Sequence, residues 1–257
     1  MRVKPTVQQY SNYTSEDFEV WALLFNRQMD HLRQHAGKRY LEALDQIGFA
    51  AGRIPDFAET NLRLQAATGW QLAVAKELVP DDEFFSLLAR RIFPATCWLR
   101  TLEELDYLEE PDMFHDVFGH APLLMDPAYA AFMEAFGKLA LQWLHEPGAL
   151  KLLSAVYWFT IEFGLLAEEG TVRIFGAGIL SSIGESVHAL GPRSEKLSFD
   201  LKRMMHTAYR TDVLQDTYFV IDSFEQLCEA LPLIVSELES LFGEGAIQAT
   251  KEQIQVC

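Results

Sequence analysis

His115 and His120 are the residues best suited to chemistry, because two imidazoles stand five residues apart within segment 111–120. Five residues along a regular α-helix leave two side chains about 140° apart around the axis, so the rings cannot both point at one atom from such a helix. A helix end or a π-bulge would bring them together, and Gly119 supplies the backbone freedom for it. The pair alone is compatible with a metal site or with a structural role.

The spacing of these histidines differs from that in zinc proteases. The H-E-x-x-H helix of those enzymes places its histidines four residues apart, with a glutamate between them as the base. Here the spacing is one residue longer and Asp116 follows His115. A zinc hydrolase is therefore disfavoured.

Glu162 is the third candidate ligand. At helical spacing it shares a face with apolar residues, namely Ala155, Trp158, Phe159, Leu165 and Leu166. A buried carboxylate without a partner is costly, so Glu162 must meet a cation, a metal or a proton. Two histidines and one carboxylate form the facial triad that holds non-haem Fe(II) and leaves other positions open for O2 and substrate. The alternative is an ion pair between Glu162 and an arginine.

Three motifs resemble the tetrahydropterin-dependent aromatic amino acid hydroxylases, and within that family the short bacterial phenylalanine 4-hydroxylases. They are residues 109–124 (EEPDMFHDVFGHAPLL), 157–164 (YWFTIEFG) and 175–182 (FGAGILSS), and they occur in the family's order. The resemblance runs from about Tyr13 to about Gly243. It implies a mainly α fold with a few short β-strands, in which the iron lies in a central basket of helices.

The resemblance implies that His115, His120 and Glu162 bind Fe(II), and that a tetrahydropterin and O2 react there to convert L-phenylalanine to L-tyrosine. Two alternatives within the family are 3-hydroxylation of phenylalanine and hydroxylation of tryptophan. A metal-binding protein without catalytic turnover is an alternative from a different class.

The resemblance also assigns residues around the iron. Arg100 matches the arginine that binds the substrate carboxylate, for which a guanidinium fork is well shaped; a surface ion pair with the acidic run 103–112 is the alternative. The other substrate-pocket matches are Trp158, Phe163, Gly178 and Ser181. The pterin matches are Leu78, Val79, Phe84 and Asp116. Asp112 is expected to accept a hydrogen bond from the second ring nitrogen of His115, and Tyr157 is expected near the iron.

The chain departs from the family pattern at three places. Glu77 replaces a glycine that usually precedes the pterin-contacting residues, and Leu108 stands where animal members carry a threonine. Residues 215–218 read Gln-Asp-Thr-Tyr in place of Gln-Pro-Leu-Tyr. We therefore expect the pterin loop and the lid near Tyr209 to differ from the family pattern, which leaves substrate choice and regiochemistry open.

Composition limits the class of protein. The chain has 257 residues, 49% of them hydrophobic, and a net charge of −16. This length suits one large domain or two small ones, and the absence of repeats and linkers favours a single catalytic domain over residues 1–257 with short extensions at both ends. The acidic balance argues against nucleic acid or an anionic membrane as a partner.

Three cysteines, Cys97, Cys228 and Cys257, are too few and too scattered for a disulfide framework or a cysteine-rich metal site. The sequence shows no signal-peptide pattern and no apolar run of about 18 residues. We expect a cytoplasmic protein whose partners are an aromatic amino acid and a reduced pterin. Because the chain has no room for the regulatory domain or tetramerisation helix of the animal family members, we expect a monomer or a weak dimer.

Hydrophobic periodicity and capping residues predict the secondary structure. Helices are expected from residue 14 or 15 to about 35, and then at 38–47, 56–67, after the turn at 79–82, 127–144, 150–169, 182–190, 199–208 and 223–241. The last helix is expected to be interrupted or bent near Pro232. Extended segments are expected at 70–74, 92–100, 171–175 and 218–221, with a turn at 176–178.

Overall fold

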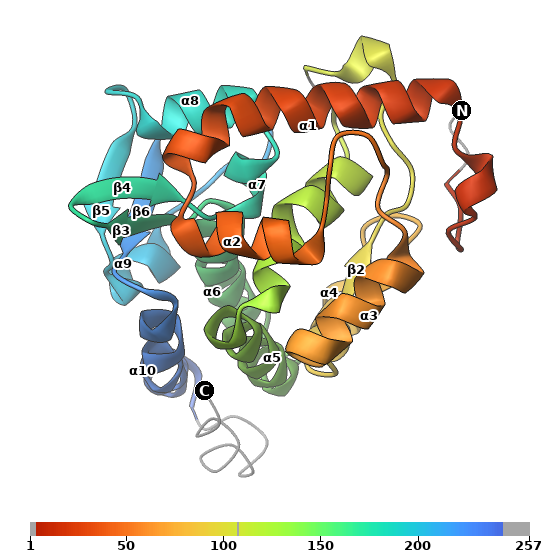
Figure 1. Cartoon of the computed structure of the whole chain (residues 1–257). Helices are drawn as coiled ribbons and strands as arrows, with labels where there is room; N and C mark the ends of the chain where they lie inside the picture. The colour runs from red at the N-terminus through yellow and green to blue at the C-terminus, as the bar shows by residue number, and fades with distance from the viewer. Residues whose placement is uncertain (1–3, 107, 244–257) are drawn as a thin grey trace.

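The computed structural model describes residues 4–106 and 108–243, and its fold is mainly α-helical with two small sheets (Figure 1). The α-helices are α1 Ser15–His35, α2 Lys38–Ile47, α3 Phe57–Ala67, α4 Asp81–Leu88, α5 Pro127–Gln142, α6 Pro147–Tyr157, α7 Ala177–Leu180, α8 Ile183–Leu190, α9 Leu201–His206 and α10 Phe224–Phe242. Three short 3₁₀ segments are η1 Tyr10–Asn12, η2 Leu102–Glu104 and η4 Pro122–Met125. Two π-helices, η3 Phe114–His120 and η5 Trp158–Glu162, lie near the middle of the sequence.

The strands form two separate sheets. Strands β1 Gln71–Val74 and β2 Ile92–Ala95 pair in parallel. The other sheet has the order β4-β3-β6-β5 and consists of β3 Leu165–Glu168, β4 Thr171–Ile174, β5 Glu195–Ser198 and β6 Thr217–Ile221. Strands β3 and β4 are antiparallel, and the other two pairs are parallel. Figure 1 shows this larger sheet on one side of the molecule and β2, α3 and α4 on the other.

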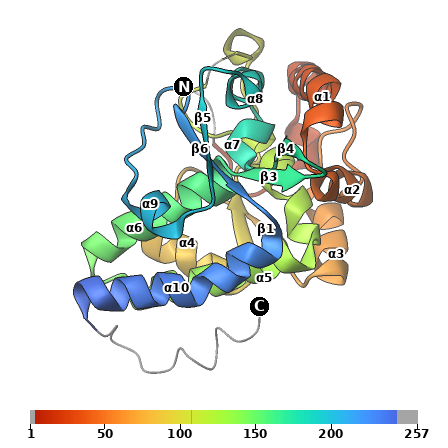
Figure 2. The same cartoon turned by 90° about the vertical axis from the view of Figure 1, so that its left-hand side faces the viewer.

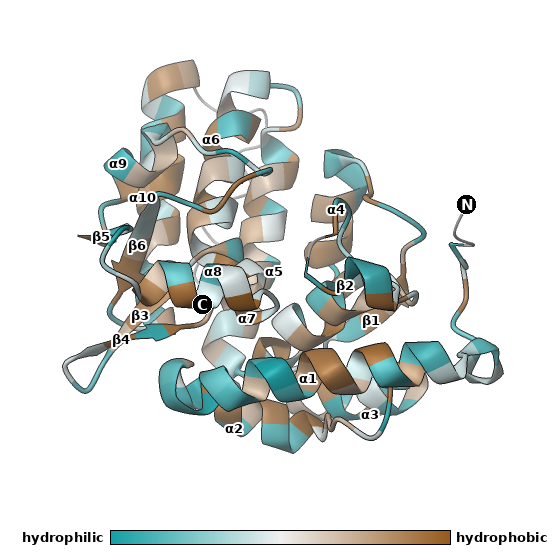
Figure 3. Cartoon of the chain, turned by 90° about the horizontal axis from the view of Figure 1, so that it is seen from above, coloured by the Kyte–Doolittle hydropathy of each residue, from teal (hydrophilic) through white to brown (hydrophobic). Residues whose placement is uncertain are grey.

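Helix α1 illustrates how the sequence determines an element. Thr14 and Asp17 form a reciprocal capping box at its start. Along the helix, hydrophobic and hydrophilic residues alternate in bands (Figure 3), and Trp21, Leu24 and Leu32 are buried. The helix predicted from residue 14 or 15 to about 35 is thus confirmed.

Helix α10 packs along α5 (Figure 2).

Several element predictions are wrong in part. The helix expected over 150–169 ends as an α-helix at Tyr157, continues as η5 and gives way to β3. Gly164 permits this reversal, since a Cβ there would lie 2.2 Å from both the Phe175 ring and the Thr160 carbonyl oxygen. The apolar residues Leu165 and Leu166, which mimic helical periodicity, pair with β4 and β6 instead.

Other differences are smaller. Strand β2 ends at Ala95, so most of the extended segment 92–100 forms no strand, and the expected turn at 176–178 runs into α7. Strand β5 was not predicted. Helix α10 continues through Pro232 without interruption. In the described part of the chain, every helix is too short or too polar to cross a membrane.

Candidate active site

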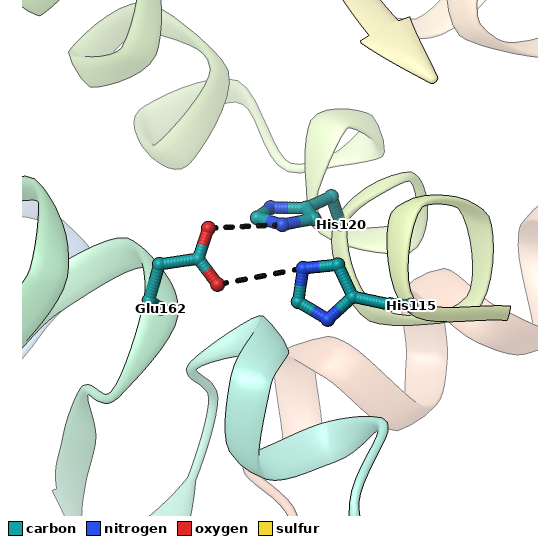
Figure 4. Close-up of side chains that lie close together, drawn as sticks. All are labelled: His115, His120 and Glu162. Carbon is teal, nitrogen blue, oxygen red and sulfur yellow. Dashed lines mark ion pairs between the residues drawn. The ribbon is translucent and has the colours of Figure 1, made fainter. Parts of the chain in front are cut away.

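Residues 114–120 form the π-helix η3, which brings His115 and His120 together. A π-bulge was one of the two ways in which their spacing could allow this. Their ring centroids lie 5.1 Å apart with the planes nearly perpendicular. Glu162, at the end of η5, completes the group: its carboxylate oxygens lie 3.2 Å from His120 Nε2 and 3.6 Å from His115 Nε2 (Figure 4). All three ligand atoms lie within 4.8 Å of one another.

The aromatic face of η3 fixes the orientation of this helix. Phe114 and Phe118 stack on each other at 4.6 Å. Phe114 contacts Trp21 of α1 edge-on, and Phe118 contacts Phe25 in the same way. Because these rings are buried against α1, the histidines are held toward Glu162 by the hydrophobic core.

Helix α7 closes on η3 by backbone contact. A Cβ on Gly119 would lie 2.9 Å from the carbonyl oxygen of Ala177, so only glycine leaves room there. A Cβ on Gly176 would lie 2.5 Å from the carbonyl oxygen of Glu162. These two glycines thus let α7 approach both ligand-bearing helices. At Gly119, the structure requires space, not a left-handed backbone.

Glu162 is largely buried, with 15% of its side chain exposed. Burial by itself raises the pKa of this carboxyl, but His120 and His115 outweigh that effect and hold the pKa below its ordinary value. Within residues 4–106 and 108–243, these histidines are its ion-pair partners, so the alternative of an arginine partner is wrong. The carboxylate therefore faces only the other two candidate ligands, among the described residues, and can bind a metal together with them.

The three donor groups suit a divalent transition metal. Ser181 Oγ donates to the Ala177 carbonyl at 2.8 Å and lies 2.9 Å from His115 Nδ1. Since its proton is already donated, Ser181 accepts from Nδ1–H, and this leaves the lone pair on Nε2, the nitrogen that faces Glu162. His120 is 2% exposed and packs on Phe93, with Nε2 again toward Glu162. This pair of nitrogens and the carboxylate fit the facial triad that binds Fe(II).

Asp112 has a different role from the one expected. Its carboxylate accepts from the backbone N–H of His115 at 3.2 Å, while the His115 ring is bound by Ser181. The prediction that Asp112 accepts from the second ring nitrogen is therefore wrong. Asp112 fixes the backbone from which the ring projects, since Arg100 holds it through both carboxylate oxygens.

Arg100 forms a buried bidentate ion pair. Its Nε and Nη2 each lie 2.9 Å from an oxygen of Asp112, which is fully buried, and its own side chain is 11% exposed. Its Nη1 lies 3.5 Å from the Leu105 carbonyl oxygen. The partner is thus the last acid of the run 103–112, as in the ion-pair alternative, but the pair is buried and does not lie on the surface. It leaves N–H groups of the outer guanidinium nitrogens for a further anion.

Three of the predicted substrate-pocket residues adjoin one another. The Trp158 ring lies 4.5 Å from that of Phe163 and stacks on Tyr209 at 4.6 Å. A Cβ on Gly178 would lie 2.8 Å from the Phe163 ring, so glycine admits that ring to its place. The fourth predicted residue, Ser181, follows Gly178 at the end of α7, but its side chain binds His115.

The predicted pterin residues are less closely grouped. Phe84 packs edge-on against Tyr157 at 5.5 Å and is half-buried. Val79 is half-buried, whereas the side chain of Leu78 is 76% exposed and Glu77 is exposed too. Leu78 and Glu77 are thus far more exposed than the side chains around Glu162.

Asp116 is buried and Tyr157 is half-buried beside the histidines and Glu162. Asp116 accepts from the backbone N–H and the hydroxyl of Thr96 at 2.7 and 2.9 Å, and burial raises its pKa despite the nearby histidines. Burial and then the charge of Glu162 raise the pKa of Tyr157, which keeps this phenol protonated. Sequence reasoning missed Thr96, because its contact with Asp116 spans 20 residues and no motif marks it.

Comparisons with known proteins agree with this geometry. Residues 5–255 match the family described as biopterin-dependent aromatic amino acid hydroxylase. The phenylalanine-4-hydroxylases of Chromobacterium violaceum and Ralstonia nicotianae are 48% and 46% identical over 224 residues; the matches cover 87% of this chain and 75% and 71% of those proteins. The chain therefore belongs to the biopterin-dependent aromatic amino acid hydroxylases.

Solved structures agree as well. The Chromobacterium violaceum phenylalanine hydroxylase with bound iron(III) and 7,8-dihydrobiopterin has a TM-score of 0.85 and 46% identity, covering 93% of this chain and 88% of that one. The same protein with iron and phenylalanine bound has a TM-score of 0.84 and 43% identity, with the same coverage. The fold class predicted from the sequence is confirmed.

Proposed function

We propose that the chain is a phenylalanine 4-monooxygenase, which uses O2 and a tetrahydropterin at Fe(II) to convert L-phenylalanine to L-tyrosine. The observation that carries the proposal is the convergence of His115, His120 and Glu162: His120 is buried, the other two are half-buried, and within residues 4–106 and 108–243 the ion-pair partners of Glu162 are these two histidines. Relatives named phenylalanine-4-hydroxylase at 41–48% identity support the choice of substrate and product.

His115, His120 and Glu162 are the proposed iron ligands. When bound, the iron and the reduced pterin supply the activation of O2 and two electrons. The chain contributes geometry: three ligands on one side leave the other positions accessible. Ser181 keeps His115 in the tautomer whose Nε2 is unprotonated.

The amino acid is held at both ends in this proposal. Arg100 binds the substrate carboxylate with its remaining N–H groups, while Asp112 keeps the fork from rotating. Trp158, Phe163 and Gly178 form the wall for the aromatic ring. Fixing both ends presents one edge of the ring to the oxidant, which is the contribution of orientation to the rate.

The pterin is proposed to lie between Phe84 and the metal. Phe84 offers the ring on which the pterin stacks, with Leu78 and Val79 at its edge. Asp116, held by Thr96 through one oxygen, orients the pterin through water with the other. Tyr157 fills the space beside Glu162 and excludes solvent.

We also propose that the chain acts as one catalytic domain, as a monomer or weak dimer in the cytoplasm, and without nucleic acid or membrane partners. The match of one family over residues 5–255 supports the single domain. The charge of −16 disfavours polyanionic partners.

The test is anaerobic reconstitution with Fe(II), followed by air, tetrahydropterin and L-phenylalanine, with products separated by chromatography. We expect para-tyrosine in proportion to bound iron. A suitable control is His145→Ala, since His145 stacks on Trp143 outside the proposed iron site and its removal should leave the yield unchanged.

Other products would change the proposal in defined ways. meta-Tyrosine would keep the chemistry and overturn the regiochemistry, and hydroxytryptophan formed in preference to tyrosine would overturn the substrate. Bound iron without O2 consumption, for any aromatic amino acid, would show a metal-binding protein without turnover.

A further inference from the structure

Gln215 is a buried hub, 5% exposed, that uses every polar group it has. Its backbone N–H donates to Glu185 Oε1 at 3.1 Å, and its carbonyl oxygen lies 3.0 Å from His188 Nε2. Its side-chain Nε2 donates to the carbonyl oxygens of Arg210 and Val213 at 2.7 and 2.9 Å. These contacts hold the amide in one orientation.

The remaining polar atom of Gln215 binds the proposed substrate pocket. Its Oε1 accepts from the indole Nε1–H of Trp158 at 3.0 Å. The indole is also held by stacking on Tyr209, with the planes 16° apart, and by contact with Phe163. The rings fix the plane of the indole, and Gln215 fixes its rotation within that plane.

Glu185 is a further buried partner of Gln215. It is 5% exposed and accepts from the Tyr218 hydroxyl as well as from Gln215. The two residues of segment 215–218 that keep the family pattern, Gln215 and Tyr218, are therefore the buried ones. Asp216 is exposed and Thr217 is half-buried, so the departures from the pattern lie toward the surface.

We propose that Gln215 is a positioning residue that sets the Trp158 indole and, through it, the fit of the aromatic substrate. The proposal rests on the proposed function, because it needs Trp158 to line the substrate pocket. The departures at Asp216 and Thr217 leave this Trp158 contact intact.

The physical reason is that an indole N–H buried without an acceptor is unfavourable. If Gln215 lost its carbonyl, the Trp158 ring would turn toward another acceptor or toward water. Either movement changes the wall of the pocket without touching the iron ligands. Substrate binding should then suffer while the metal centre stays unchanged.

The test is a double-mutant cycle with Gln215→Met, which keeps the size but not the amide, and Trp158→Phe, which removes the indole N–H. In the wild-type background we expect Gln215→Met to raise the KM for L-phenylalanine about tenfold, with kcat within about twofold and iron content unchanged. In the Trp158→Phe background the same change should raise KM less than about twofold.

An equal rise of KM in both backgrounds would overturn the proposal, because it would mean that Gln215 acts by loosening the segment and not through the indole. Ser194→Ala is the matched control: it removes a buried hydroxyl that bonds the His188 and Ala189 carbonyls but does not contact Trp158. It should leave KM unchanged. A wild-type protein that hydroxylates no aromatic amino acid would instead contradict the proposed function itself.

A second measurement needs no Gln215 variant. In protein labelled with ¹⁵N-tryptophan, the indole signal that disappears in Trp158→Phe belongs to Trp158. Its N–H should exchange slowly with solvent if Gln215 holds it. Exchange as fast as that of an exposed indole would contradict the hydrogen bond on which the proposal depends.

Discussion

The metal centre differs in construction from the stretch 77–79, which we propose borders the pterin and which we call the rim. Around the metal centre, His120 and Asp112 are almost fully buried, and the close approach of α7 to η3 leaves no room for a Cβ at Gly119. At the rim, Leu78 is 76% exposed and Glu77 is exposed. The difference indicates that the ligand geometry is set by the packed core, whereas the rim consists of side chains that have few neighbours. Changes at the centre should be nearly all-or-none and changes at the rim graded.

Glu162→Ala should have the largest effect. It removes a proposed ligand, so we expect iron content to fall to background and hydroxylation to drop more than about a hundredfold, beyond the loss typical of residues that merely orient ligands. Iron analysis and product assay measure both. Glu237→Gln is the matched control, because Glu237 is also 15% exposed but pairs with Lys202. Retention of iron by Glu162→Ala would remove this residue from the centre.

Gly119→Ala tests whether backbone packing sets the ligand geometry. Its Cβ would clash with the Ala177 carbonyl oxygen, and such overpacking costs about 1–3 kcal/mol. We expect a lower melting temperature and weaker iron binding, both measurable on the same sample. Gly184→Ala in α8 is the control, since the nearest atom to its Cβ would be 4.0 Å away. Equal behaviour of the two variants would show that η3 tolerates displacement of α7.

Arg100→Lys tests whether the guanidinium of Arg100 binds the substrate carboxylate. Lysine keeps the charge opposite Asp112 but loses the fork, so we expect KM for the amino acid to rise about tenfold with iron still bound. Arg100→Ala is less informative, because it leaves the buried Asp112 without its partner. Arg39→Lys, at the similar pair with Asp126, should not change KM. An unchanged KM in Arg100→Lys would contradict the clamp.

Leu78→Ala should have the smallest effect. The side chain is mostly exposed, so we expect a rise of less than about threefold in KM for the pterin and no change in melting temperature or iron content. Steady-state kinetics with varied tetrahydropterin measures it. If Leu78→Ala lost as much hydroxylation activity as Glu162→Ala, the rim would be as essential as the metal centre. The proposed difference between the two regions would then be contradicted.

The sequence predicted the parts of the site that depend on local spacing. The five-residue interval between His115 and His120 required a helix end or a π-bulge, and η3 is a π-helix. The apolar face around Glu162 marked a buried carboxylate, and the family motifs identified the fold class. Such features are visible because the residues that cause them are neighbours in the chain.

Long-range contacts were not predictable in the same way. Ser181 lies 66 residues from His115, and Gln215 lies 57 residues from Trp158. Asp112 is close in sequence to both Arg100 and His115, so spacing could not decide between them; the structure gives Arg100 the carboxylate fork and His115 only a backbone bond. The end of the helical segment at Glu162 was hidden because the β3 residues that follow pair with β6, a distant segment.

The most direct test of the account is crystallography of the Fe(II)-loaded protein with anomalous scattering measured on both sides of the iron absorption edge. We predict one strong iron peak within bonding distance of His115 Nε2, His120 Nε2 and a carboxylate oxygen of Glu162, with Ser181 still bound to His115 Nδ1. A peak held by other residues, or iron-loaded crystals without a peak among these three side chains, would contradict the central claim.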